Sequence, residues 1–109
     1  MSATTTVPVT IAPEAEARLT ELGMHKELEQ MIAHIREVVP ALTAIEVEIA
    51  ERYDTGGEPG ISIRAYSDRP YDAEDKTSWN LICWAVEMFP SQVLEHLCIL
   101  QSYGRPNAR

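Results

Sequence analysis

The sequence predicts an α+β fold, in which a mostly antiparallel sheet of three or four strands carries helices on one face. Apolar and polar residues alternate strictly over 44–53 and again over 61–66, as expected for two half-buried strands. The glycine-rich stretch 54–60 joins them, which predicts an antiparallel hairpin. Helical apolar periods over 24–39 and 72–89 flank this hairpin. Strands grouped between helices favour the α+β class.

The first elements of the chain precede the hairpin. Residues 7–11 alternate like a strand, but Pro8 cannot donate to a ladder, so an edge strand or an extended arm is expected. A helix over 13–22 begins at a proline and ends at Gly23, a residue that readily adopts the left-handed conformation. The helix that follows has one apolar stripe, made of Met24, Leu28, Met31, Ile32, Ile35 and Val39.

The helix predicted over 72–89 is the centre of the fold because it holds both tryptophans and the single phenylalanine. One stripe is expected to face the core and contains Trp79, Ile82, Cys83, Val86 and Phe89. The other stripe contains Leu81, Trp84 and Met88 and is a candidate subunit interface. A helix that is apolar on both sides must be covered twice. The alternative cover for the second stripe is the amphipathic helix at 28–39.

The end of the chain predicts a short helix over 92–96 and a last strand over 97–103 that returns to the sheet. If residues 7–11 also pair in the sheet, the order becomes βαββαβ, the ferredoxin-like pattern. The first strand is central in that topology, and Pro8 opposes such a position. The three-stranded and four-stranded versions both stay open.

Length and charge limit the classes of function. A chain of 109 residues predicts one domain over 1–109, with flexible tails at about 1–5 and 104–109. The formal net charge of −8 disfavours nucleic acid and anionic membrane as partners. No apolar run approaches the roughly 18 residues of a membrane span, and no signal peptide is recognised, so a cytoplasmic location is expected. Cys83 and Cys98 lie in apolar segments and are interpreted as buried free thiols.

Recognisable catalytic or cofactor motifs are not found. The three histidines lack metal-ligand spacing, and the glycines of 56–60 have neither the lysine nor the helix of a phosphate-binding loop. Cys98 lies near His96, but the two side chains are expected to point to different faces, so no nucleophilic pair is predicted. Acidic residues around 68–75 resemble helix-capping residues more than a calcium loop. The prediction is therefore no catalytic residue, no metal and no cofactor.

A loop before the central helix is the candidate ligand site. Asp68, Arg69, Tyr71 and Asp75 combine charge with an aromatic ring, and Arg with Tyr can recognise a carboxylate or a partner chain. The function expected is a small acidic protein-interaction module without catalytic activity, forming a homodimer or the acidic half of a heteromeric pair. Its docking surface is expected to be the back of the central helix or an open sheet edge. The alternative is a small enzyme or ligand-binding domain with a site between the sheet and the loop at 68–75.

Overall fold

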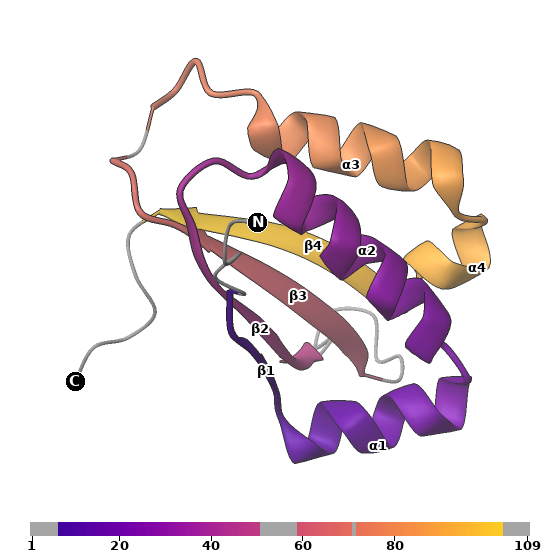
Figure 1. Ribbon diagram of the computed structural model, residues 1–109. Coiled ribbons are helices and arrows are strands. Elements are labelled where there is room, and N and C mark those ends of the chain that lie inside the picture. Colours follow the sequence, from indigo (N-terminus) through magenta and orange to yellow (C-terminus); the bar gives the residue numbers. More distant parts are fainter. Residues whose placement is uncertain (1–6, 51–58, 71, 104–109) are drawn as a thin grey trace, which may run out of the picture.

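The computed structural model describes residues 7–50, 59–70 and 72–103, which form one sheet and four helices (Figure 1). The predicted tails at 1–5 and 104–109 and most of the turn at 54–60 lie outside the described residues. In chain order the elements are β1 (Val9–Ile11), α1 (Pro13–Leu22), α2 (His25–Val38), β2 (Leu42–Ala50), β3 (Gly60–Ser67), α3 (Thr77–Met88), α4 (Ser91–Leu94) and β4 (Leu97–Tyr103). The α+β class is confirmed. Among the described helices, none has the length and apolar character needed to cross a membrane.

The sheet has the strand order β1-β2-β3-β4 and is mixed. β2 and β3 form the predicted antiparallel hairpin, but β1 pairs with β2 and β3 pairs with β4 in parallel. The prediction of a mostly antiparallel sheet is therefore wrong. In each parallel pair, two helices carry the chain back to the starting end of the sheet, so the next strand runs in the same direction as the last.

The first strand joins the sheet, as the four-stranded version requires, but it lies at an edge. The ferredoxin-like arrangement, which needs this strand at the centre, is therefore not the one formed. The edge position fits Pro8, because proline has no backbone N–H to donate to a neighbouring strand. Its carbonyl accepts a hydrogen bond from the Ile45 N–H at 3.0 Å.

The core lies between one face of the sheet and the helices (Figure 1). The odd-numbered side chains of β3 face the helices and are buried, and so are Ile45 and Val47 of β2, as the period of two predicts. Even-numbered side chains such as Glu46 and Arg64 lie on the opposite face, which is polar. The largest fully buried side chains are Leu19, Met31, Ile35, Ile45, Ile61, Ile63, Leu81 and Leu97.

The orientation of α3 differs from the prediction. Leu81 is 1% exposed, whereas Trp79 is 63% and Val86 is 61% exposed. The stripe assigned to the core thus faces outward along the helix, and only Phe89, just beyond the last turn, is buried with the core. An all-round apolar helix gives the same periodic signal for either orientation, so the pattern could not select the buried face.

The predicted interface stripe is divided by this orientation. Leu81 is buried in the core, and Met88 is 55% exposed. Trp84 is half-buried and stacks on His34 of α2, with ring centroids 3.9 Å apart and planes 2° from parallel. The amphipathic helix at 28–39 therefore covers part of this stripe, as the alternative proposed. Leu81, Trp84 and Met88 do not form one free surface.

Candidate functional site

An exposed apolar surface lies where α3 runs beside β4. Trp79, Ile82 and Val86 project from α3, with 63%, 44% and 61% of their surface exposed, and Leu100 of β4 is 38% exposed. We call these four residues the α3–β4 surface. Large apolar side chains that are exposed together mark an interaction site more often than single ones do.

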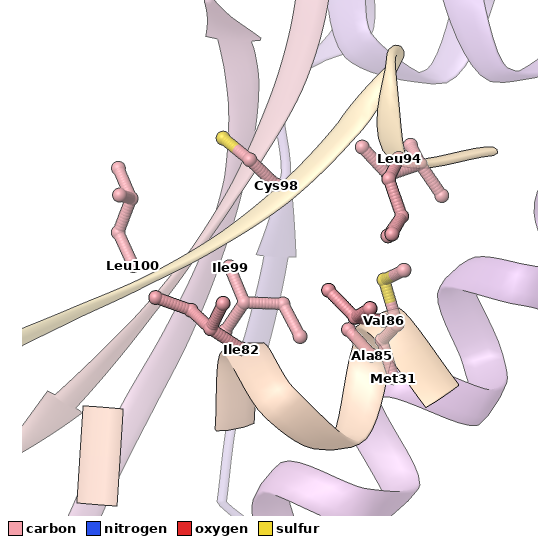
Figure 2. Close-up of a pocket in the computed structure, with 9 residues that line it drawn as sticks. Met31, Ile82, Ala85, Val86, Leu94, Cys98, Ile99 and Leu100 are labelled. Carbon is pink, nitrogen blue, oxygen red and sulfur yellow. The ribbon is translucent and has the colours of Figure 1, made fainter. Parts of the chain in front are cut away.

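A hollow of about 330 Å³ adjoins this surface (Figure 2). Ile82, Ala85 and Val86 lie on one side of it with Ile99, while Cys98 and Leu100 lie on the other side of the β4 strand (Figure 2). The hollow is thus lined by side chains from both faces of β4. Both faces of a strand can be reached from one hollow at a free edge, so the hollow lies around the outer edge of β4. Its lining residues are Met31, Ile82, Ala85, Val86, Leu94, Leu97, Cys98, Ile99 and Leu100, none of them charged.

The edge of β4 is open in the described part of the sheet, because β4 is the outermost strand and pairs with β3 alone. Its seven residues, Leu97–Tyr103, contain no proline and no charged side chain. Natural proteins usually protect an edge with charges, prolines or very short strands. The opposite edge has such protection, since β1 is three residues long and follows Pro8. The β4 edge is therefore suited to pairing with another strand.

Asp75 ties the start of α3 to the end of β4. Its Oδ1 accepts hydrogen bonds from the Thr77 hydroxyl at 2.7 Å and the Thr77 N–H at 3.0 Å. Its Oδ2 accepts one from the Tyr103 hydroxyl at 3.0 Å and pairs with the Arg69 guanidinium. Arg69 also donates to Ser67 Oγ at 3.1 Å. The carboxylate thus fixes the position of α3 over the β4 edge.

These contacts also set the charge state of Asp75. The pKa of its carboxyl is lowered from 3.8 to about 2, chiefly by the Thr77 hydroxyl and then by the Thr77 N–H. The Tyr103 hydroxyl and the Arg69 charge act in the same direction, whereas burial opposes them. Asp75 is therefore a fully ionised acceptor at neutral pH and is unsuited to proton transfer there.

A second hollow, of about 440 Å³, lies between the Asp75 network and β4 and shares Ile82 with the first. Trp79, Gln101 and Tyr103 are among its lining residues. Both amide atoms of Gln101 are buried and have no hydrogen-bond partner in the described structure. An unsatisfied buried amide costs about 1–3 kcal/mol, so Gln101 is a destabilising residue in the isolated chain.

The open face of the sheet carries a separate polar cluster. The Tyr66 hydroxyl donates to Glu46 Oε1 at 3.0 Å, and Arg64 donates to Ser102 Oγ at 2.8 Å. Partial burial raises the pKa of Tyr66 above its ordinary 10.0, and the hydrogen bond to Glu46 adds to this shift. These hydrogen bonds pair the groups with one another, which is typical of a solvated sheet face.

The structure brings together part of the predicted ligand loop. Arg69 and Asp75 are in contact, but as partners of each other rather than as free groups. Asp68 is exposed, its N–H is hydrogen-bonded to the Ala41 carbonyl at 2.8 Å, and Tyr71 lies outside the described residues. Within the described ranges no cluster of three or more side chains has the make-up of a metal site.

The residues that sequence reasoning missed are Ile82, Val86 and Leu100, and the open sheet edge that it proposed as a docking surface was not assigned to the strand over 97–103. Two signals pointed to them: α3 is apolar all round, and β4 lacks the charges expected of an edge strand. Comparisons with protein-family models, curated proteins and solved structures found no match to the chain.

Proposed function

We propose that this protein is a protein-interaction module without catalytic activity, and that the α3–β4 surface with the adjoining strand edge is its docking site. The observation that carries the proposal is the exposure of Trp79, Ile82 and Val86 beside an uncharged strand whose outer edge is open in the described part of the sheet. Burying such side chains stabilises a complex by roughly 25 cal/mol for each Å² of apolar surface removed from water.

The two parts of the site would contribute different interactions. The β4 edge offers main-chain donors and acceptors to an added strand, and the hollow around it offers contacts to apolar side chains. The Asp75 network holds the two parts in a fixed relation. Preorganisation of this kind favours binding because little ordering is needed when the partner arrives.

An enzyme or a small-ligand domain with a site at the loop 68–75 is less well supported. Asp75 and Arg69 already satisfy each other, and Asp72 Oδ1 accepts the Glu74 N–H at 2.9 Å. Such contacts stabilise turns and a helix start. We include a cytoplasmic location in the proposal because Cys83 is a free thiol, a state that a reducing compartment maintains.

Site-specific photocrosslinking in living cells tests the docking site. A benzophenone amino acid at position 86 should yield a defined crosslinked protein, since Val86 is exposed on the α3–β4 surface. Position 38 is the matched control, because Val38 is an exposed helical valine on α2. Equal adducts at both positions, or none at position 86, would overturn the proposal.

A further inference from the structure

We infer that the occupant of the docking site is a second copy of this chain, with the two β4 strands paired antiparallel about a two-fold axis at Leu100. The inference rests on the proposed function and names its partner. It would join two four-stranded sheets into one continuous sheet of eight strands, with the helices of both copies on the same side.

The backbone of β4 is arranged for this pairing. The His96 carbonyl accepts a hydrogen bond from the Ile61 N–H of β3 at 2.7 Å. Along a strand, the N–H and C=O groups of successive residues point alternately to one side and the other. The even-numbered residues of β4 therefore bond to β3, and the N–H and C=O groups of Ile99 and Gln101 point to the free edge. A two-fold axis at Leu100 places Ile99 of each copy opposite Gln101 of the other. These residues then form the hydrogen-bonded pairs of an antiparallel ladder.

The same axis covers the exposed face of α3. A two-fold axis perpendicular to the sheet keeps both helix layers on one side, so α3 of one copy faces α3 of the other across the junction (Figure 1). Trp79, Ile82 and Val86 then meet the same three residues of the second copy. A lone extended peptide would satisfy the strand edge but leave this helix face in water. A second copy supplies a strand and an apolar helix in the required relation.

Charge also favours a second copy over a basic partner. The chain has a formal net charge of −8, yet neither β4 nor the lining of the hollow contains a charged residue. A basic partner would therefore find no acidic group there to pair with. Two copies can meet at this strip without placing like charges in contact, and like charges opposed at an interface would weaken it.

Molar mass in solution gives the first test, by light scattering on a size-exclusion column. The wild-type protein should have twice the chain mass of 12.2 kDa. Val86→Glu should raise the dimer dissociation constant by at least about tenfold, because it buries an unpaired charge, whereas Val38→Glu on α2 should leave it within about twofold. Circular dichroism checks that both variants are folded. A wild-type monomer at millimolar concentration would overturn the inference.

Disulfide trapping tests the register. In a background with Cys83→Ser and Cys98→Ser, the Leu100→Cys variant should form a covalent dimer on oxidation, because side chains at a non-hydrogen-bonded antiparallel pair lie about 4.5–5.5 Å apart at Cβ. Thr10→Cys is the matched control, an exposed strand position on the opposite edge. Equal trapping of both variants, or none at Leu100→Cys, would overturn this geometry.

The experiments distinguish failure of the docking site from failure of the second copy as its occupant. If the protein is monomeric and the photocrosslinker at position 86 captures a different protein, the second copy is wrong and the docking site stands. If no adduct forms at position 86, both are wrong.

Discussion

Asp75 is the residue on which several local contacts converge. Its side chain is 9% exposed and joins the loop at Arg69, the first turn of α3 at Thr77 and the end of β4 at Tyr103. The sequence predicted Asp72 as a helix cap with Asp75 in the first turn, and this is wrong, because α3 begins at Thr77 with Lys76 in the cap position. Asp75 precedes the cap and accepts the Thr77 N–H from there. The contact with Tyr103 links positions 28 residues apart, which no local pattern could predict.

The lowered pKa of Asp75 predicts a specific dependence of stability on pH. The pKa of Asp75 in the folded protein, about 2, lies below the ordinary value of 3.8. The ionised carboxylate therefore contributes fully to the free energy of unfolding above about pH 4, and this contribution is lost as pH falls towards 2. Urea unfolding of wild type and Asp75→Asn should therefore differ most near neutral pH, and the difference should shrink between pH 4 and pH 2. Glu29→Gln, at an exposed position of α2, should show no such convergence. A constant difference across this range would contradict the assignment.

Gln101 predicts a stabilising substitution. Gln101→Met keeps the length of the side chain and removes a buried amide that has no partner in the described structure. We expect the free energy of unfolding to rise by about 1 kcal/mol, measured by urea denaturation of the monomer. Gln30→Met, at an exposed site on α2, should change it by less than about 0.5 kcal/mol. A loss of stability in Gln101→Met would mean that the amide has a partner in solution.

Elements were more predictable than their orientation. The helix over 13–22 and the strand over 97–103 have the predicted bounds, because a proline start, a glycine end and an uninterrupted apolar run are local signals. Gly23 adopts the expected left-handed conformation, with φ 66°. The start of α3 is later than predicted, at Thr77, since residues before it are used in turns around Asp72 and Asp75. Which face of α3 is buried depends on packing against β4 and α2, which periodicity does not encode.

The observed orientation of α3 predicts unequal costs for two truncations. Leu81→Ala should lower the free energy of unfolding by about 2–5 kcal/mol, because Leu81 is buried in the core. Trp79→Ala should cost less than about 1 kcal/mol in the monomer, because most of the indole is exposed. Urea denaturation at a concentration low enough to keep the protein monomeric measures both. Similar costs for the two variants would imply the orientation that periodicity suggested.

At the scale of the whole molecule, the chain consists of two similar halves. Each half is a parallel pair of strands joined by two helices, and the halves meet at the antiparallel contact of β2 with β3. The sequence predicted this central hairpin but not the parallel pairs, because each depends on where a crossover returns the chain. An antiparallel contact between two β4 strands would repeat the central junction at the outer edge. Two copies would thus continue the alternation of parallel pairs and antiparallel junctions.

The net charge predicts that salt strengthens this association. Each copy carries a formal charge of −8, so two copies repel, while the proposed contact holds no ion pairs for salt to weaken. The Debye length falls from about 30 Å at 0.01 M to about 10 Å at 0.1 M, which screens this repulsion. The dimer dissociation constant, measured by sedimentation equilibrium, should fall by about tenfold between 0.01 M and 0.5 M sodium chloride. Removing two exposed charges on α2 with Glu29→Gln and Glu37→Gln should flatten this dependence. If salt instead weakens the dimer, charged groups must pair across the contact, and the uncharged α3–β4 surface is not what joins the two copies.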